Sequence, residues 1–509
     1  MREIYGDFIE MKHKFMLAAS IVVLALGLMA GSASAALPGS GWWTAYVVAN
    51  LSNTSAQVDA SASELQGGSA TSYASSNTIA GQANQTYHPS FCGGAGLLTC
   101  FSPSLPSGFN GSVVLSSNQP IAAVVQLGNN ASGQVGVSGG TASAQYNGKS
   151  SGSQSIGAPV VKHNFGNKTT TFYVQAAGSA ASVTATYNMN NGQSFTDGPR
   201  SIDANRSYLF DPAAAGVPSS GCGGDPNASA CVGAVTFNST SGAIVGVVIE
   251  HQHSASPGKV AQSTALFADS DGSSKVFCPV FKNAFPSNNP RYTGLTVQNV
   301  GTSATTVNLT ATGIFGDGAG QSYTDSVATL DPGKSHVFFP TSDNIGSFAE
   351  NTYGAVAIEA SDSNAKLVAT INEANFSGTS RQTTFGCFGA ESATSKVSLP
   401  LHKESFSNNI TGIAFQNVGS TSTDVTATFT CNGNTYTHVT KTVNAGDGDF
   451  YYLPSGSAAN WSGTAMPSGS LCAVTLEASN GGSIVAIAQE SAAAGNDLDT
   501  KNYEGFNIQ

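Results

Sequence analysis

The sequence repeats one phrase four times, at a spacing of about 120 residues. In the clearest copy, the stretch 353–361 (YGAVAIEAS) is followed after a short polar turn by 366–372 (KLVATIN). Related pairs of stretches are found at 232–237 and 244–250, at 472–477 and 484–489, and, more diverged, at 111–115 and 121–126. A fixed period of this length indicates an array of similar modules. We therefore expect repeated units rather than one continuous core.

The length of 509 residues suits four modules of ordinary domain size. Their expected boundaries are 36–156, 157–275, 276–395 and 396–509, after a signal peptide at 1–35. Lys12 and Lys14 precede an apolar run from Phe15 to Met29, and small residues at 33–35 offer a cleavage site before Ala36. No later apolar stretch is long enough to span a bilayer. The sequence thus predicts a secreted, extracellular protein of the cell surface, without a transmembrane segment in the mature chain.

Charged residues are scarce, at 10% of the chain, and the net charge is −11. This balance gives no electrostatic reason to bind nucleic acid. Hydrophobic residues still reach 40% and occur in ordered runs, which argues against a disordered chain. We expect a folded protein with no nucleic-acid partner.

Each module reads as a succession of short strands separated by Gly, Asn, Asp and Ser. In the third module, 292–298 alternates apolar and polar residues, breaks at 299–301 and resumes at 306–312, and the fourth module repeats this pattern. Gly301 and Gly419 are expected to be turn residues with a positive φ, and the asparagine two positions before each is able to bond its own turn backbone. About seven strands per module and no helical period predict an all-β chain of four tandem immunoglobulin-like antiparallel β-sandwiches.

Eight cysteines in an exported chain can all pair. Two short pairs bracket Gly-rich loops at matching places in the first and second modules, and the other four residues lie near the ends of the third module and within the fourth. The alternative, a metal site, lacks any CxxC or Cys/His spacing. We predict the disulfides Cys92–Cys100, Cys222–Cys231, Cys278–Cys387 and Cys431–Cys472, although the sequence allows other connectivities.

Two recurring polar positions mark the module junctions. Prolines 159, 279 and 400 are each followed three residues later by a lysine, namely Lys162, Lys282 and Lys403. We expect each lysine to bond a neighbouring carbonyl or acid, the alternative being a lysine that faces a ligand. The second recurring position is a polar residue at the end of the last strand of each module. It is occupied by Gln126, Glu250, Asn372 and Gln489. These side chains are expected to satisfy backbone groups at the junctions.

Two sites resemble metal-binding patterns. His251 and His253 alternate along a strand and would share a face, as in the beginning of a metal site, but no third ligand is evident. Asp269 and Asp271 open like a calcium loop, but the later glutamate of that loop is missing. A solvent-facing histidine pair and a plain polar turn are the competing interpretations. We expect no cofactor, with calcium as the alternative.

No catalytic motif is present: a nucleophile elbow, a phosphate loop and a zinc-protease helix are all lacking. The chain is therefore expected not to be an enzyme. Trp42 and Trp43 begin the mature chain, and because adjacent strand residues point to opposite faces, at most one of them can be core. An exposed tryptophan there would suit carbohydrate binding.

The segments TGLTVQNVGTSATTVNLTATG, from Thr293, and TGIAFQNVGSTSTDVTATF, from Thr411, resemble the strand-Asn-x-Gly-strand core of cell-adhesion-related (CARDB-like) modules. They are also similar to repeats of large exported surface proteins of Chloroflexota-type bacteria. The resemblance covers the last two modules well and the first two loosely. It implies tandem immunoglobulin-like repeats with a stalk, adhesive or surface-layer role, and it implies no catalytic residues.

Together these features predict an exported, non-catalytic structural or adhesive cell-surface protein, as a component of a surface layer, sheath or stalk. Sandwiches arranged in series, each stabilised by its own disulfide, would determine how far the protein extends. The expected partners are cell-surface polymers or glycans, or copies of the chain itself. The alternative is a secreted carbohydrate-binding protein.

Overall fold

The computed structural model describes residues 41–129, 142–222, 224–253, 261–288, 290–340, 348–374, 382–431, 433–451, 460–492 and 500–508. The predicted signal peptide lies outside these residues. In the described part the chain is all-β, with strands β1 to β35 and three short 3₁₀ turns, and every pairing between named strands is antiparallel. No helix among the described residues has the length and apolar character to cross a membrane.

The element series repeats four times, and we call the repeats modules 1 to 4. Module 1 contains β1 (Trp42–Asn50), β2 (Ala56–Glu64), β3 (Tyr73–Ile79), β4 (Asn84–Tyr87), β5 (Gly111–Ser117), β6 (Ile121–Asn129) and β7 (Ala142–Asn147). Module 2 contains β8 (Ser155–Phe165), β9 (Lys168–Ala176), β10 (Ala181–Met189), β11 (Ser194–Ile202), β12 (Ser207–Phe210), η1 (Pro226–Ala228), β13 (Val232–Ser239), β14 (Ile244–Gln252), β15 (Ala261–Ala265), β16 (Phe267–Ala268) and η2 (Asp269–Asp271).

Modules 3 and 4 follow the same order. Module 3 contains β17 (Lys275–Asn283), β18 (Tyr292–Asn299), β19 (Thr305–Gly316), β20 (Ser322–Leu330), β21 (Ser335–Phe338), β22 (Thr352–Ala360), β23 (Leu367–Ala374), β24 (Gln382–Gly386), β25 (Phe388–Gly389) and η4 (Ala390–Ser392). Module 4 contains β26 (Lys396–Phe406), β27 (Asn409–Asn417), β28 (Thr423–Cys431), β29 (Asn434–Thr437), β30 (Lys441–Val443), β31 (Gly448–Tyr451), β32 (Ser470–Ala478), β33 (Ile484–Ala492), β34 (Thr500–Glu504) and β35 (Phe506–Asn507).

Each module has two layers of strands, which we call the inner and the outer sheet. The inner sheets run β4-β1-β6-β7, β12-β9-β14-β15, β21-β18-β23-β24 and β31-β27-β33-β34. The outer sheets run β3-β2-β5, β11-β10-β13-β8-β16, β20-β19-β22-β17-β25 and β29-β28-β32-β26-β35. In the outer sheets alternate residues of a strand are buried, as in β2 and β28, because one face covers the core and the other faces out. Strands of the inner sheets, such as β27, are buried on both faces.

The first strands of modules 2 to 4 are β8, β17 and β26, and each carries a proline inside a central strand. The pairing of each with its neighbour shifts register at that proline, next to Pro159, Pro279 and Pro400. A β-bulge of this kind leaves a residue unpaired, so the missing N–H of proline costs no ladder hydrogen bond. The recurring proline thus marks a bulge that is repeated in the first strand of modules 2 to 4.

Four large apolar clusters correspond to the four modules. Two of these clusters include side chains of a neighbouring module. The cluster of module 3 includes Ala414, Val485 and Ile487 of module 4. The cluster of module 4 includes Val47 and Val124 of module 1. The modules are therefore packed together through their apolar surfaces, and residues 37–509 form one compact unit.

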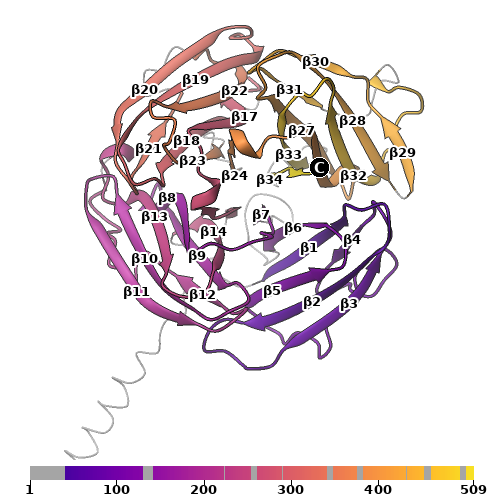
Figure 1. The fold of residues 1–509 in the computed structure, drawn as a ribbon, viewed down its shortest axis with the longest axis horizontal. Coiled ribbons are helices and arrows are strands. Elements are labelled where there is room, and N and C mark those ends of the chain that lie inside the picture. The colour runs from indigo at the N-terminus through magenta and orange to yellow at the C-terminus, as the bar shows by residue number, and fades with distance from the viewer. Residues whose placement is uncertain are drawn as a thin grey trace, which may run out of the picture. The chain divides into compact units, whose positions relative to one another are not determined.

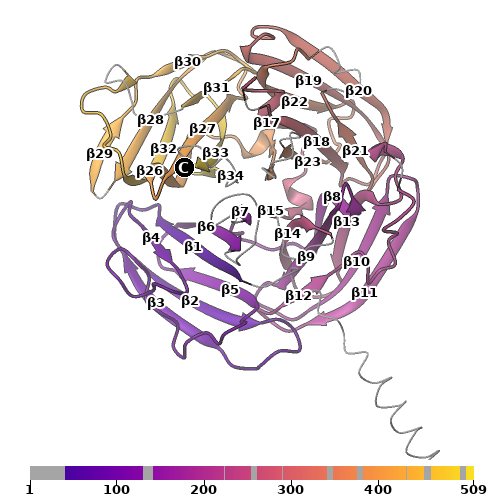
Figure 2. The same cartoon turned by 180° about the vertical axis from the view of Figure 1, so that it is seen from behind.

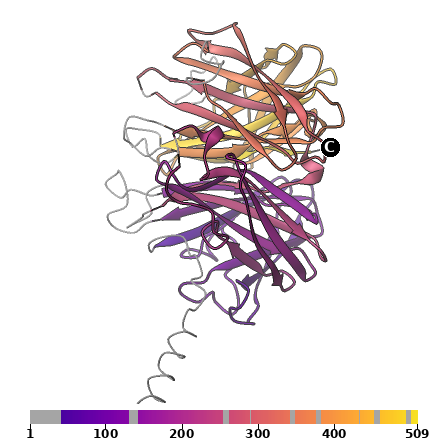
Figure 3. The same ribbon diagram turned by 90° about the vertical axis from the view of Figure 1, so that its left-hand side faces the viewer.

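Within this unit the modules follow one another around a common centre (Figure 1), and the view from behind shows the same order (Figure 2). Figure 3 gives the side view. The central strands are β7, β15, β24 and β34, one from each module, and each contacts the next: β7 with β15, β15 with β24, β24 with β34, and β34 with β7. Modules 4 and 1 also contact each other. The modules therefore do not form the extended series, with a length set by the number of modules, that the sequence predicted.

Side-chain bonds join these central strands. Ser263 donates to the Gln145 carbonyl at 3.1 Å, linking β15 to β7. The Gln262 amide donates to the Gln382 side-chain oxygen at 2.8 Å, linking β15 to β24. The Gly386 N–H donates to the Glu504 carboxylate, linking β24 to β34, and the Asn147 amide donates to the Glu504 carbonyl at 2.7 Å, linking β7 to β34.

The turns at Gly301 and Gly419 have the asparagine hydrogen bond that was predicted, but not the predicted glycine backbone angle. Neither glycine has a positive φ, so that part of the prediction was wrong. The Asn299 side chain accepts from the Gly301 N–H at 2.9 Å and donates to the Ser303 carbonyl at 2.8 Å. A Cβ at Gly301 would lie 3.1 Å from the same asparagine oxygen. The glycine therefore makes room for the asparagine, and does not supply an unusual backbone angle.

Candidate functional site

The recurring lysines each contact a buried glutamate of their own module. The Nζ–Oε distances are 2.7 Å for Lys162–Glu250, 2.7 Å for Lys282–Glu373 and 2.8 Å for Lys403–Glu490. The lysine comes from the first strand of the outer sheet, and the glutamate comes from β14, β23 or β33 of the inner sheet. Each pair therefore joins the two sheets next to a module junction.

A second cation reaches each glutamate. Lys168 lies 3.5 Å from Glu250, Arg291 lies 2.9 Å from Glu373, and Lys501 lies 2.9 Å from Glu490. These cations occupy three different places in their modules: the beginning of β9, the residue before β18, and the central strand β34. The pairing of one carboxylate with two cations is repeated, although the second cation is not at a repeated sequence position.

An amide from the following module completes each cluster. Asn372 donates to Glu250 at 3.4 Å, Gln489 donates to Glu373 at 3.5 Å, and Gln145 donates to Glu490 at 3.3 Å. The clusters therefore bridge module 2 to 3, 3 to 4, and 4 to 1. We refer to them as the junction clusters.

The strand registers correct the predicted alignment of the junction residues. Glu250, Glu373 and Glu490 face Thr170, Thr293 and Thr411, and the residue of module 1 in the same register is Leu127, which faces Thr44. The amide position is one residue earlier, at Asn372 and Gln489, and in module 2 it is Ile249. In module 1 the residue at this position is Gln126, but its amide nitrogen has no hydrogen-bond partner, and the amide that reaches Glu490 comes from Gln145, which faces Gln126 on β7. Glu250 therefore does not belong with Gln126, Asn372 and Gln489. The glutamate position and the amide position are adjacent and have different partners.

Burial and the neighbouring cations oppose each other at these carboxylates. Burial raises the pKa of Glu373 and of Glu490, but two cations outweigh it in each case, and the pKa is lowered from 4.5 to about 2. The pKa of Glu250 is lowered by the same balance. Burial lowers the pKa of Lys282, and it lowers the pKa of Lys168 to about 8. The carboxylates are therefore ionised and paired with cations at neutral pH. Such groups can hold modules together, but they are poor donors or acceptors of protons near pH 7.

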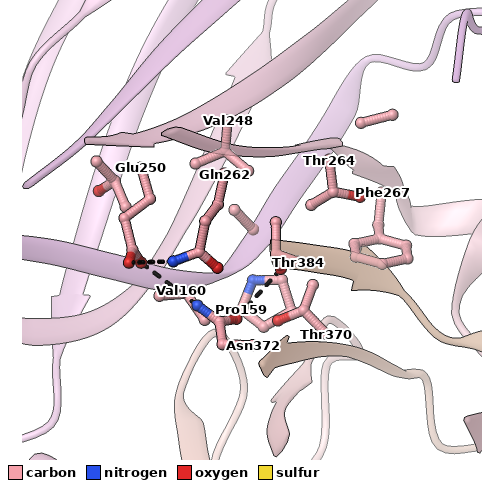
Figure 4. Close-up of a pocket in the computed structure, with 13 residues that line it drawn as sticks. Pro159, Val160, Val248, Glu250, Gln262, Thr264, Phe267, Thr370, Asn372 and Thr384 are labelled. Carbon is pink, nitrogen blue, oxygen red and sulfur yellow. Dashed lines mark hydrogen bonds between the residues drawn. The ribbon is translucent and has the colours of Figure 1, made fainter. Parts of the chain in front are cut away.

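A small cavity lies beside Glu250, between modules 2 and 3 (Figure 4). Pro159, Val160 and Phe267 form part of its apolar wall, while Gln262 and Asn372 point their amides toward the carboxylate. The space admits about one water molecule. This site has the polar groups of a binding pocket but lacks room for a substrate.

The predicted histidine pair is divided between a buried and a turn position. His251 is buried, and its Nδ1 lies 3.0 Å from the Gln252 carbonyl. His253 follows the end of β14, where its Nδ1 lies 2.7 Å from the Thr169 hydroxyl and its ring is 5.4 Å from that of His163. Burial lowers the pKa of both. Among the described residues, no group of three His, Cys, Asp or Glu side chains is placed to hold a metal ion.

The two aspartates of the predicted calcium loop form the 3₁₀ turn η2. Asp269 accepts from the Ser153 hydroxyl at 2.7 Å, and Asp271 pairs with Lys149 at 3.0 Å. Asp271 also accepts from the Ala268 N–H at 2.9 Å. Protein donors therefore engage both carboxylates, in the manner of a turn that fastens module 1 to module 2.

Both tryptophans at the beginning of β1 are half-buried. The Trp43 ring packs 5.3 Å from that of His88, and a Cβ at Gly128 would lie 2.4 Å from the indole. Trp42 packs against the cluster of Leu127, Ala144, Val247 and Ile249. Neither indole stands clear of the surface as a platform for a sugar.

The structure forms four disulfides, and their partners are those favoured by the positions of the cysteines in the modules. They are Cys92–Cys100, Cys222–Cys231, Cys278–Cys387 and Cys431–Cys472. None of the described cysteines is free. All four bonds lie within single modules, so the junctions depend on noncovalent contacts.

No protein-family model and no curated protein matches this sequence. Among solved structures, the chain is similar to a protein described as Thermotoga maritima 1070, with 15% identity, a TM-score of 0.19, and coverage of 23% of this chain and 96% of that one. It is also similar to a tetra-tandem repeat in the extending region of a large adhesion protein, with 12% identity, a TM-score of 0.11, and coverage of 90% of this chain and 93% of that one.

Proposed function

We propose that this chain is an exported, non-catalytic structural or adhesive protein of the cell surface, acting as a subunit of a surface layer or sheath. The observation that carries the proposal is the use of its repeated charged positions. The glutamates of the three junction clusters are buried where modules meet, so these repeated charged residues serve to hold the molecule together.

The predicted leader and the composition support this role. Export is proposed from the signal peptide at 1–35, with cleavage before Ala36. Charged residues make up only 10% of the chain, so little self-repulsion opposes dense lateral packing. We further propose that the modules are immunoglobulin-like and related to the CARDB-like repeats of bacterial surface proteins. The proposed partners are copies of the chain or polymers of the cell surface.

The circular arrangement favours a compact subunit over a stalk. The central strands of all four modules contact one another in sequence, and modules 4 and 1 also pack together. A molecule arranged in this way does not extend with the number of its modules. Within the structural class we therefore propose a layer or sheath subunit.

Two experiments test the proposed role. Immunogold electron microscopy of intact cells should place the native protein in a lattice or coat at the surface. Purified residues 36–509 should form ordered sheets without added ligand. Diffuse secretion together with a protein that stays monomeric at all concentrations would contradict the proposal.

Carbohydrate binding remains the second candidate function, and a polar groove favours it. The groove has a volume of about 280 Å³ and lies between the outer sheet of module 2 and module 3. Thr186, Thr236 and Asn238 contribute hydroxyl and amide groups of the kind that bind sugars. Glycan-array binding that is lost in Asn238→Leu but retained in Trp42→Ala would support this function and locate it in the groove. No glycan binding at millimolar concentration would remove it.

A further inference from the structure

The junction between modules 2 and 3 differs from the others at one position of the inner sheet. This position lies three residues before each junction glutamate, or before Leu127 in module 1. Modules 1, 2 and 4 have Val124, Val247 and Ile487 there, and each belongs to an apolar cluster shared with the preceding module. Module 3 has Thr370, which is 3% exposed. A hydroxyl therefore lies in a buried interface where the other junctions have an aliphatic side chain.

The hydroxyl of Thr370 lines the small cavity beside Glu250. Its oxygen is buried and makes no hydrogen bond to any described residue. Because an unpaired buried hydroxyl is costly, a polar group at this place requires a partner inside the cavity.

A second unpaired atom, the side-chain oxygen of Gln262, lines the same cavity from module 2. The amide nitrogen of Gln262 donates to Glu250 at 2.9 Å and to the Gln382 side-chain oxygen at 2.8 Å. Because an ionised carboxylate only accepts hydrogen bonds, this nitrogen must face Glu250. The oxygen then points away from the carboxylate, as Figure 4 shows.

The two unpaired atoms form a complementary pair. The other threonines of the lining, Thr170, Thr264 and Thr384, already donate to a backbone carbonyl or to a carboxylate. Thr370 has a hydroxyl proton to donate and Gln262 has an oxygen that accepts, but the two are not bonded to each other. A group placed between them can satisfy both.

The size of the cavity identifies this group. A volume of about 20 Å³ is enough for one water molecule, and a buried water needs at least two polar partners, which Thr370 and Gln262 provide. A small cation would fit less well, because Lys162 and Lys168 already lie at 2.7 and 3.5 Å from Glu250.

We propose that one ordered water molecule is a constant part of the junction between modules 2 and 3. The Thr370 hydroxyl donates to this water, and the water donates to the Gln262 oxygen. The bridge joins β23 to β15 and holds Gln262 with its nitrogen toward Glu250. It thereby supports the junction cluster whose second cation is the most distant of the three. This inference depends on the junction and not on the proposed surface role.

Thr370→Val tests the bridge with little change of shape, and it copies the valine of modules 1 and 2. A crystal structure of the parent protein should show a water within hydrogen-bond distance of Thr370 and Gln262, and that of the variant should lack it. Oxygen-17 relaxation of the solvent should report one long-lived water fewer in the variant. The unfolding equilibrium constant from urea denaturation should rise about tenfold, because Gln262 keeps a buried oxygen without a partner.

Thr171→Val is the matched control. Thr171 is also 3% exposed and its hydroxyl also lacks a partner, but it does not line this cavity. This variant should retain the water at Thr370. It should be no less stable than the parent protein, because the substitution removes an unpaired hydroxyl and breaks no hydrogen bond.

Two outcomes would overturn the proposal. The first is a parent crystal structure that shows other buried waters but none at Thr370. The second is a Thr370→Val protein at least as stable as the parent, which would mean that the cavity is dry. Thr370→Ile, copied from Ile487, separates the two cases again: it should lower the urea midpoint by displacing the water, whereas an increase would identify an empty cavity that a larger side chain fills.

Discussion

At the residue scale, the stability of the fold depends strongly on the buried carboxylate of Glu373. Glu373→Gln leaves Lys282 and Arg291 buried without a counter-charge, so we expect a loss of about 3 to 5 kcal/mol in the free energy of unfolding. Urea denaturation at pH 7 measures it. The matched control is Glu359→Gln, which breaks the exposed Lys275 pair of the same module and should cost less than about 1 kcal/mol. Equal losses in the two variants would refute a special role of the junction cluster.

The same carboxylates predict how stability depends on pH. The pKa of Glu373 and of Glu490 is lowered from 4.5 in the unfolded chain to about 2 in the folded protein. A lowered carboxylate pKa stabilises the fold fully above pH 4.5, and this stabilisation is lost as the pH falls from 4.5 to about 2. The urea midpoint should therefore fall steeply over that interval. In Glu490→Gln the decrease should be smaller, and an unchanged pH profile would contradict the assignment.

His402 adds a separate acid response at higher pH. It is buried against Phe429, and burial lowers its pKa from 6.5 to about 3. The unfolded chain gains a proton below pH 6.5 while the folded protein does not, so stability decreases as the pH falls from 6.5 to 3. His402→Leu, which follows the apolar Phe281 and Val161 of the other modules, should reduce the decrease between pH 6.5 and 4.5, and the remainder comes from histidines such as His251, whose pKa burial also lowers. An unchanged decrease over this interval would assign the effect to other groups alone.

The sequence identified the repeated lysines at the residue scale, but it misaligned their partners. The proline bulge and the lysine have a fixed spacing, so Lys162, Lys282 and Lys403 were recognisable. The glutamates have no such marker, and adjacent polar residues such as Asn372 and Glu373 made a one-residue error easy. Strand registers alone separate the two positions. Burial of His402 was equally invisible, because histidine has no fixed preference for core or surface.

At the scale of elements, the disulfide Cys278–Cys387 connects β17 to the segment between β24 and β25. Its loop spans 109 residues, whereas that of Cys92–Cys100 spans 8. Loop-closure entropy predicts a contribution of about 4 to 5 kcal/mol for the long loop and about 2 to 3 kcal/mol for the short one. Replacing both members of a pair by alanine and comparing Tm by calorimetry should show the larger decrease for Cys278 and Cys387. The reverse order would mean that native-state strain outweighs chain entropy.

The sequence predicted the strands well because their alternation and turn residues are local signals. In the third module the alternation at 292–298 and 306–312 lies within β18 and β19, which are Tyr292–Asn299 and Thr305–Gly316. The contacts of the central strands were not predictable in this way. Asn147 and Glu504 are 357 residues apart, and the bonds between such strands use Ser, Gln and Asn side chains without a repeated motif.

At the scale of the whole molecule, the four junctions are built on one plan with one exception. Three junctions have a first strand, a glutamate with two cations, and an amide from the next module. At the junction between modules 1 and 2 the described residues include no such strand and no such charged cluster, and Leu127 and Ile249 lie there in a small apolar cluster.

This asymmetry predicts different costs for one substitution at equivalent positions. Val485 of module 4 packs into the core cluster of module 3 and is 0% exposed, whereas the equivalent Val245 of module 2 is half-buried. Val485→Asp places a charge in a closed apolar interface and should cost more than about 3 kcal/mol, while Val245→Asp keeps its carboxylate in water and should cost about 1 kcal/mol or less. Urea denaturation gives both values, and small-angle scattering should show an increased radius of gyration only for Val485→Asp. Comparable costs would mean that the first junction is as tightly filled as the other three.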